Sequence, residues 1–203
     1  MIDGPAGKLE AVLLTKDDAV ANIGLAVIAH PHPLHGGSMD NKIVQTLFKT
    51  FAELGYVAVK FNFRGVGNSA GHYGEGAGET QDVLAVVAAL RAQPTYRELP
   101  LLLAGFSFGG AVQAHAAQSL RPQKLVLVAP SVDSSVDRLD APAVASVAGS
   151  TLIIHGEADE VVPLKSVLDW ARAQDLPVTV IPGGEHFFHG RLTLLKKIVA
   201  DFS

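Results

Sequence analysis

Gly105-Phe106-Ser107-Phe108-Gly109 is the stretch of this sequence that decides the fold. It follows an apolar run, Pro100–Gly105, and it opens a segment with a helical pattern, Phe108–Leu120. Gly-x-Ser-x-Gly between a strand and a helix is typical of a sharp turn that raises the serine hydroxyl to the carboxyl edge of a sheet. An isolated match is more often an ordinary tight turn, so the prediction of a nucleophilic serine depends on the flanking elements and on partner residues.

Short apolar runs alternate with longer amphipathic segments along the rest of the chain. The runs are rich in Val, Ile, Leu and Ala, as strands buried on both faces are, and they are Leu9–Thr15, Gly24–His30, Tyr56–Phe63, Pro100–Gly105, Lys124–Ala129, Thr151–His155 and Pro177–Ile181. The predicted helices are one that ends before Gly55, then Glu79–Ala92, Phe108–Leu120, Pro163–Gln174 and His189–Phe202. This alternation predicts an α/β fold whose mainly parallel sheet carries helices on both faces.

The same pattern predicts the extent of the domain, the two ends of the first helix and the irregular loops. We expect one domain over residues 1–203, a minimal core without a large lid. Ser38 or Asp40 is the expected N-cap of the first helix, and Gly55 its C-terminal stop. Two irregular loops, Arg64–Gly78 and Ser131–Ser150, are too short for a lid domain, although the second has room for a short helix.

The composition excludes several classes of protein. The 203 residues are 48% hydrophobic and 18% charged, with a net charge of −4 and no cysteine. Without a Lys/Arg cluster we expect no nucleic-acid partner, and without cysteine there is no disulfide scaffold or thiolate site. No apolar run reaches membrane-spanning length and the N-terminus lacks a signal pattern. We therefore expect a cytoplasmic protein that acts on a small molecule away from membranes; the sequence leaves its oligomeric state open.

An acid is expected in the loop after the strand Thr151–His155. A serine hydroxyl needs a base to take its proton and a carboxylate to orient that base. In the known hydrolases whose Gly-x-Ser-x-Gly turn this segment resembles, the chain order is Ser, acid, His. Three carboxylates follow the strand, and Asp159 lies between it and the helix opened by Pro163. We prefer Asp159 as the acid, because Glu157 and Glu160 are more typical of solvated loop charges.

A base is expected after the last strand, Pro177–Ile181. His186 lies on the loop just past two glycines, whereas His189 falls where the last helix is predicted to begin. His155 precedes the acid and so breaks the chain order. The pattern therefore predicts Ser107, Asp159 and His186 as the catalytic residues.

With these segments the chain resembles the α/β-hydrolase superfamily. Within it, the chain is similar to the small lidless bacterial serine hydrolases related to dienelactone hydrolases, and the similarity covers nearly the whole chain. The segments that carry it, besides Gly105–Gly109, are His155-Gly156-x-x-Asp159-x-x-Val162-Pro163, Gly183-Gly184-Glu185-His186-Phe187 and Asn62–Ser69. Many relatives have Asp where Asn62 stands; we interpret that turn as structural, so the departure leaves the chemistry unaffected.

The resemblance implies a second oxyanion donor in His30-Pro31-His32-Pro33-Leu34-His35, beside the N–H of Phe108. Proline has no N–H, so the donor is His32 or Leu34, and the sequence does not choose between them. The three histidines also suggest a metal site, since imidazole is the commonest metal ligand. We expect instead that His30 fixes the loop by hydrogen bonds, and we expect neither a metal nor an organic cofactor.

The expected activity is hydrolysis of an ester-type bond in a small substrate through an acyl-enzyme, as in a carboxylesterase. A thioesterase, a lactonase, a small-peptide hydrolase, a non-catalytic binding protein and a metal-dependent hydrolase remain alternatives. Phe106 and Phe187 are the expected apolar wall of the substrate site, among the flanking residues Leu34, Phe106, Phe108, Phe187 and Phe188. Phe106 or Phe188 could equally pack into the core. An open apolar cleft favours short or medium acyl groups.

Overall fold

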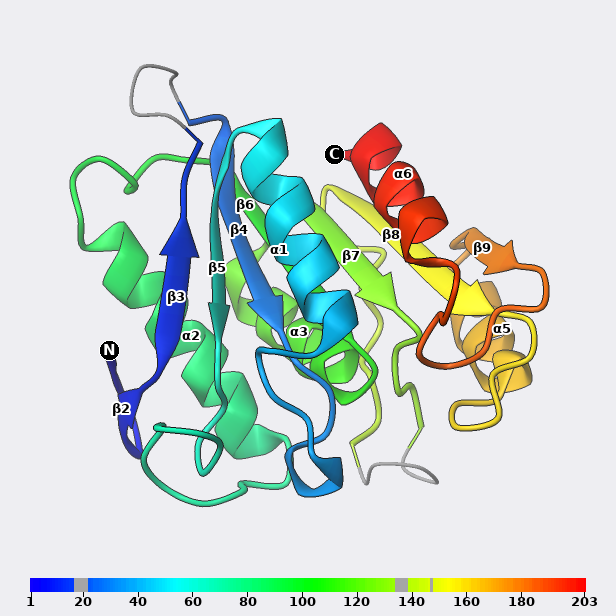
Figure 1. The fold of residues 1–203 in the computed structure, drawn as a ribbon, viewed down its shortest axis with the longest axis horizontal. Helices are drawn as coiled ribbons and strands as arrows, with labels where there is room; N and C mark the ends of the chain where they lie inside the picture. Colours follow the sequence, from blue (N-terminus) through cyan, green and yellow to red (C-terminus); the bar gives the residue numbers. More distant parts are fainter. Residues whose placement is uncertain (17–21, 134–138, 147) are drawn as a thin grey trace.

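A seven-stranded sheet forms the centre of the computed structural model, which describes residues 1–16, 22–133, 139–146 and 148–203 (Figure 1). In chain order the strands of this sheet are β3 (Ala11–Leu14), β4 (Gly24–Ala29), β5 (Tyr56–Phe61), β6 (Leu101–Phe106), β7 (Lys124–Val128), β8 (Ser150–Gly156) and β9 (Val178–Ile181). Their spatial order is β3-β5-β4-β6-β7-β8-β9, and only the edge strand β3 pairs antiparallel to its neighbour. The predicted mainly parallel α/β fold is therefore confirmed.

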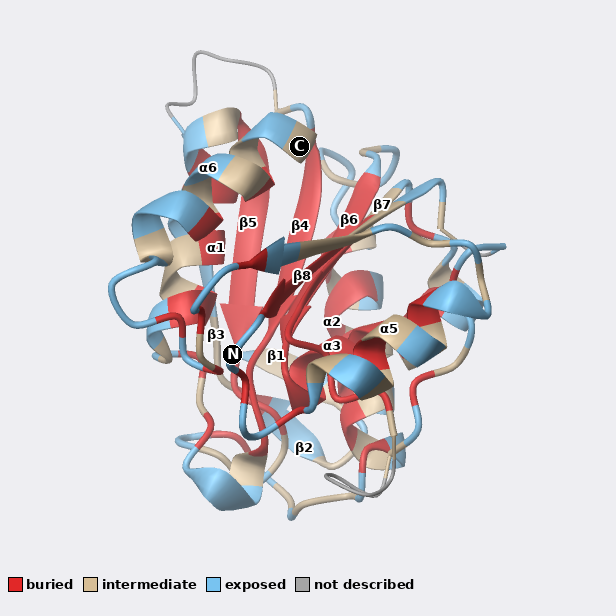
Figure 2. Cartoon of the chain, turned by 90° about the vertical axis from the view of Figure 1, so that its right-hand side faces the viewer, coloured by how far each residue is buried: buried red, intermediate tan, exposed pale blue. Residues whose placement is uncertain are grey.

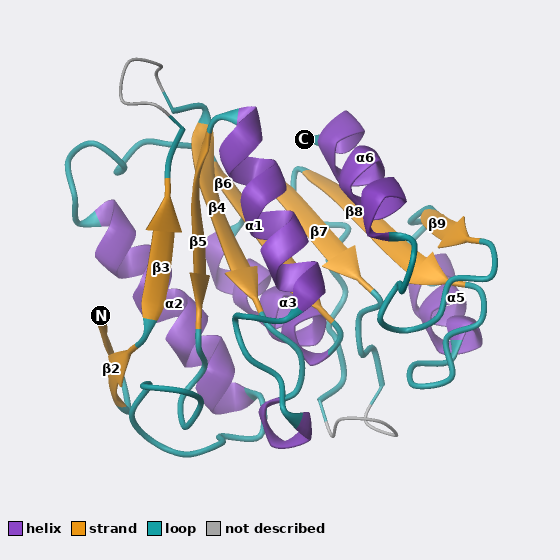
Figure 3. Ribbon diagram, in the orientation of Figure 1, coloured by secondary structure: helices purple, strands orange, loops and turns teal. Residues whose placement is uncertain are grey.

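Helices cover both faces of the sheet (Figure 3). They are α1 (Lys42–Leu54), α2 (Ala77–Arg91), α3 (Phe108–Leu120), α5 (Leu164–Arg172) and α6 (Leu192–Phe202). α1 and α6 pack on one face and α2, α3 and α5 on the other (Figure 1). Successive strand residues point to opposite faces, so Val27 joins the core under α3 while Ile28 joins the core under α1.

The central strands are buried along their whole length (Figure 2). Burial on both faces explains their nearly continuous apolar sequences. In register, Ala29 lies beside Gly105, Phe106 beside Val128 and Gly156 beside Ile181. The carboxyl ends of the parallel strands therefore lie at one edge of the sheet, and the loops that leave them can contact each other there.

Several predicted boundaries differ from those of the structure. The predicted strand Leu9–Thr15 is shortened to β3, Ala11–Leu14, because Leu9 instead ends β2 (Gly7–Leu9), which forms a separate antiparallel hairpin with β1 (Ile2–Gly4). Asn41, rather than Ser38 or Asp40, caps α1, since its Oδ1 accepts from the N–H groups of Ile43 and Val44. The Gly55 stop is confirmed, with φ at 98°.

The last helix begins at Leu192 and not at His189. Phe188 and Gly190 adopt φ values of 53° and 69°, and a helix cannot run through left-handed residues. In the loop Ser131–Ser150 residues 134–138 and 147 lie outside the described residues, so the short helix expected there is not tested. No helix among the described residues is long and apolar enough to cross a membrane.

Candidate active site

Ser107 lies on the turn between β6 and α3, with φ at 55° and ψ at −121°. That backbone conformation is costly for a residue with a Cβ atom, and the surroundings must hold it in place. The Ser107 N–H donates to the Val128 carbonyl at 2.9 Å, and its own carbonyl accepts from Gly110 and Ser131. The turn is therefore held from the helix and from the neighbouring strand.

The two glycines of the turn are required by close backbone approach. A Cβ atom at Gly105 would lie 2.2 Å from the Gly109 carbonyl oxygen, and one at Gly109 would lie 2.4 Å from the His30 carbonyl oxygen. Real Cβ atoms do not come so close to backbone. Both glycines thus let the start of α3 sit directly against the ends of β6 and β4.

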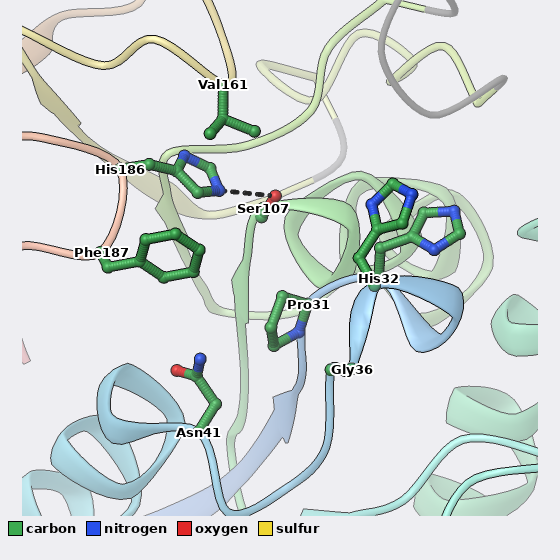
Figure 4. Close-up of a pocket in the computed structure, with 10 residues that line it drawn as sticks. Pro31, His32, Gly36, Asn41, Ser107, Val161, His186 and Phe187 are labelled. Atoms are coloured by element: carbon green, nitrogen blue, oxygen red, sulfur yellow. Dashed lines mark hydrogen bonds between the residues drawn. The ribbon is translucent and has the colours of Figure 1, made fainter.

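A chain of hydrogen bonds joins three loops at this edge. His186 Nε2 lies 3.1 Å from Ser107 Oγ, and His186 Nδ1 lies 2.7 Å from Asp159 Oδ2 (Figure 4 draws the first of these). Because an ionised carboxylate only accepts, Nδ1 carries the proton and Nε2 is left to accept from the serine hydroxyl. All three residues are buried. The structure therefore brings together the three residues that the sequence pattern selected.

Asp159 is held as an anion by its loop. Its Oδ1 accepts from the N–H groups of Val161, at 2.9 Å, and Val162, at 2.8 Å. Burial alone would raise the pKa of Asp159, but the hydrogen bond from His186 and these two N–H groups outweigh it and hold the pKa below its usual value. Asp159 is therefore ionised and can accept the hydrogen bond from His186 Nδ1.

A second histidine lies behind the carboxylate. His155 is fully buried; its Nε2 lies 3.0 Å from the Val162 carbonyl oxygen and 3.5 Å from Asp159 Oδ2. Burial lowers the pKa of His155 more than these two oxygens raise it, so it is neutral and donates through Nε2. Its Nδ1 has no hydrogen-bond partner in the described part of the chain.

The rival acid and base residues lie elsewhere in the two loops. Glu157 accepts from the Gly183 N–H at 2.9 Å and so ties the acid loop to the histidine loop. Glu160 is exposed, and His189 pairs with Glu185 at the surface at 3.0 Å. None of them contributes to the chain of hydrogen bonds from Ser107.

The His30–His35 loop forms one side of the site. His30 is fully buried: its Nδ1 lies 2.6 Å from the Pro31 carbonyl oxygen and its Nε2 accepts from the Phe63 N–H at 3.0 Å. Both ring nitrogens are used in fixing the loop, and burial lowers the pKa of His30 to about 4. No group of three or more His, Asp or Glu among the described residues is placed to hold a metal ion.

The two candidate oxyanion donors in this loop differ in their contacts. The Leu34 N–H donates to His32 Nδ1 at 3.1 Å, and the Leu34 side chain is 67% exposed. Leu34 is therefore engaged in the turn, which leaves His32 as the better candidate. Phe108 is the first residue of α3, where an N–H has no acceptor within its own helix.

A small pocket of about 170 Å³ opens beside Ser107 (Figure 4). It is lined by Pro31, His32, His35, Gly36, Gly37, Asn41, Ser107, Val161, His186 and Phe187. Phe187 is 45% exposed and lines the pocket as expected, but the expectation for Phe106 was wrong. Phe106 is fully buried and packs under His186, with ring centroids 4.9 Å apart, because it points inward from the end of β6. Phe108 and Phe188 are also fully buried.

Sequence reasoning missed Asn41 and Tyr73. Tyr73 Oη lies 3.1 Å from His32 Nε2, and the two rings are 5.0 Å apart. Tyr73 comes from the loop between β5 and α2, and no local pattern marks it for the site. Asn41 was findable in part, since it belongs to the cap segment Ser38–Asn41 and asparagine is a preferred N-cap residue.

Comparison with known proteins gives one family. The family model described as serine aminopeptidase, S33 matches residues 32–150. An α/β serine hydrolase without a lid from Xanthomonas campestris is 37% identical in sequence, with a TM-score of 0.85 over 98% of this chain and 90% of that one. A structure of an α/β serine hydrolase homologue from Coxiella burnetii is 39% identical, with a TM-score of 0.84 over 98% and 94% of the two chains. An uncharacterised protein of Rickettsia prowazekii is 28% identical over 98% of this chain and 86% of its own length.

Proposed function

Because this chain belongs to the α/β serine hydrolases, in their small lidless group, we propose that it cleaves an ester-type bond of a small substrate through an acyl-enzyme. The observation that carries the proposal is the unbroken chain of hydrogen bonds from Ser107 through His186 to Asp159. Nucleophile, base and orienting acid stand at hydrogen-bond distance without any rearrangement.

The proposed reaction has two half-reactions. Ser107 Oγ forms a bond to the substrate carbonyl carbon while His186 Nε2 takes the hydroxyl proton. The resulting imidazolium donates through Nδ1 to Asp159 and then passes the proton from Nε2 to the departing alcohol. A water molecule repeats the sequence on the acyl-enzyme, releasing the acid and restoring Ser107.

The oxyanion of each tetrahedral intermediate is proposed to lie against Phe108 N–H and His32 N–H. The first is at the N-terminus of α3, where the helix dipole also favours negative charge. Preorganised donors of this kind typically contribute roughly 100- to 1,000-fold each to kcat.

A small substrate is supported by the size of the pocket. Its volume of about 170 Å³ is below the range of about 300–1,000 Å³ that holds drug-sized ligands. Phe187 and Val161 provide apolar contact on one side, and both are 45% exposed, so the pocket is open at its rim.

Labelling with a fluorophosphonate probe tests the proposal. The native protein is expected to label at Ser107, and Ser107→Ala to lose labelling and to lower ester kcat by roughly 10⁴- to 10⁶-fold while keeping the fold. His186→Ala and Asp159→Asn are expected to give large losses as well, with Asp159→Asn the mildest. A Ser107→Ala protein with full activity, or inhibition by EDTA that zinc reverses, would exclude the serine mechanism.

A second candidate, aminopeptidase activity, is favoured by one neighbouring feature. Glu160 and Glu185 line a hollow next to His186 and Phe187, where a substrate ammonium group could bind. Against it, Glu185 already accepts from Phe187 and His189 N–H groups and pairs with the His189 ring. Aminoacyl p-nitroanilides separate the two: we expect turnover of p-nitrophenyl esters and none of the anilides.

A further inference from the structure

The side-chain amide of Asn41 has its orientation set by the helix that it caps. Oδ1 of Asn41 accepts from the N–H of Ile43 at 2.8 Å and lies 3.4 Å from the N of Val44. Helix N–H groups need an acceptor, so the oxygen must face α1 and the NH₂ group must face the other way. The cap thus removes the usual ambiguity between the two ends of an asparagine amide.

The NH₂ group of Asn41 faces the pocket that contains Ser107. Figure 4 shows the amide pointing from the start of α1 into the space between Pro31 and Phe187. Within the described residues no group accepts a hydrogen bond from Asn41 Nδ2. Asn41 is half-buried, so its NH₂ group is a fixed donor at the wall of the site.

The other described side chains around this pocket offer no carboxylate to the Asn41 donor. His32 Nδ1 accepts from Leu34, so its Nε2 carries the proton and lies against Tyr73 Oη. The His35 ring stacks on the His32 ring, with centroids 4.5 Å apart. No Asp or Glu is among the described residues that line this pocket. A substrate group with an acceptor oxygen is the complement of such a wall, because a purely apolar group would desolvate the Asn41 donor without replacing its hydrogen bonds.

We propose that this pocket binds acyl groups that carry a second acceptor oxygen, such as a keto oxygen, which accepts a hydrogen bond from Asn41 Nδ2. The inference rests on the proposed ester hydrolysis at Ser107. The acyl group stays on Ser107 through both half-reactions, so a donor that holds it acts in each of them. Asn41 is thus the residue that determines specificity between oxygenated and purely hydrocarbon acyl groups.

Matched pairs of substrates test the proposal. p-Nitrophenyl 4-oxopentanoate is compared with 4-methylpentanoate, and 5-oxohexanoate with 5-methylhexanoate; within each pair a carbonyl oxygen replaces a methyl group. Each kcat/KM is divided by the hydroxide-catalysed rate of the same ester, which removes differences in intrinsic reactivity. We expect the native protein to prefer one or both keto esters by about 3- to 10-fold, the range of a neutral hydrogen bond.

Two variants keep the helix cap and change the donor. Asn41→Asp retains a good capping oxygen and Asn41→Gly weakens the cap by only about a few tenths of a kcal/mol, but neither presents a side-chain donor to the pocket. In both variants, we expect the ratio of the corrected kcat/KM of the keto ester to that of the methyl ester to fall to about 1 or below. The hydrogen bond from Asn41 accounts for the whole native preference, and these variants lack it. A ratio measured on one preparation does not depend on the fraction of protein that is folded. Lys42→Gln changes the charge by the same amount as Asn41→Asp at the next, exposed position, and it is expected to keep the native ratio.

Binding without turnover gives a second readout, independent of ester hydrolysis. In the Ser107→Ala protein, the Asn41 NH₂ signals in ¹⁵N NMR spectra are assigned by their loss in Asn41→Asp. Ethyl 5-oxohexanoate is expected to shift them, and ethyl 5-methylhexanoate is not. A protein that cleaves esters with no keto preference, or whose preference survives in both Asn41 variants, overturns the inference alone. A protein that cleaves no ester overturns the proposed function, and the NMR shifts then decide the inference.

Discussion

At the scale of the residue, the site depends on side chains held in conformations or surroundings that are unfavourable to them. Ser107 has a positive φ, and His30 is neutral in the core. The backbone strain at Ser107 costs stability at every pH, whereas the burial of His30 costs stability only at pH values where the unfolded chain would protonate it. Substitution at each residue measures its contribution separately.

Replacing Ser107 with glycine is expected to give a more stable protein than replacing it with alanine. Both changes remove the hydroxyl, but only glycine adopts φ near 55° without a steric penalty. We expect the free energy of unfolding of Ser107→Gly to exceed that of Ser107→Ala by about 1 kcal/mol in urea titrations. Ser166, inside α5, is the control, because there the order must reverse and glycine must be the less stable. Equal stability of the two Ser107 variants would contradict a strained turn.

The burial of His30 is expected to make the free energy of unfolding depend on pH. The folded protein keeps His30 neutral down to about pH 4, whereas the unfolded chain protonates it near pH 6.5. Between these values the unfolded state binds more protons, so stability falls as the pH drops from 6.5 to 4, by about 3 kcal/mol for this one group. His30→Gln is expected to flatten the dependence, measured as unfolding free energy at several pH values. An equally steep dependence in the variant would assign it to other groups, of which His155 is the first to examine.

At the scale of the element, the loop between β5 and α2 is held by buried charges at its two ends. Arg64 binds Asp82 of α2 through Nη2, at 2.7 Å, and through Nε, at 3.1 Å. Glu79 of α2 accepts from the N–H groups of Gly74 and Gly76. These contacts flank Tyr73, so they also position the hydroxyl that meets His32.

Breaking the Arg64–Asp82 pair is expected to be costly because the Asp82 side chain is fully buried. Arg64→Met leaves an uncompensated buried carboxylate and is expected to lower the free energy of unfolding by about 3–5 kcal/mol, measured by urea titration. The double variant Arg64→Met/Asp82→Leu is expected to recover much of that loss. Arg172→Gln, which removes an exposed partner of Asp169, is the control and is expected to change stability by less than about 1 kcal/mol. A loss at Arg64 no larger than at Arg172 would mean that the carboxylate is not buried in solution.

At the scale of the whole molecule, the described residues form the sheet, its flanking helices and the N-terminal hairpin, without an inserted cap domain. The pocket that the described residues form beside Ser107 is small and open at its rim, and it has no room to bury a long acyl chain.

This architecture predicts a preference for short or medium acyl groups. We expect kcat/KM for p-nitrophenyl esters to peak between roughly two and eight carbons, since each further methylene that stays in water adds none of its about 0.8 kcal/mol. Activity is expected to show no rise at an oil–water interface, because activation of that kind requires a lid to open. Faster cleavage of emulsified long-chain triglycerides than of soluble short esters would contradict both expectations. It would indicate that Ser131–Ser150 forms a cap over the site.

The resemblance to α/β-hydrolases implied the chain order of serine, acid and histidine, and the sequence by itself determined the parallel sheet and the turn at Ser107. These features are encoded locally: burial on both faces forces continuous apolar strands, and a tight strand-to-helix turn forces glycines around the serine. Once the sheet is parallel, its carboxyl ends share an edge, so the loops that carry Asp159 and His186 were expected near Ser107; Glu157, Glu160 and His189 lie on the same loops and remained rivals.

The tertiary structure alone decided which neighbouring groups form the walls of the site. Phe106 and Phe187 are both aromatic and both adjoin catalytic groups, yet one is in the core and the other at the pocket. Tyr73 meets His32 across 41 residues of chain, and the Leu34 N–H is used by a turn that no periodicity predicts. The physical reason is that loop side chains are placed by long-range packing and hydrogen bonds, whereas a local pattern reports only which segments are buried.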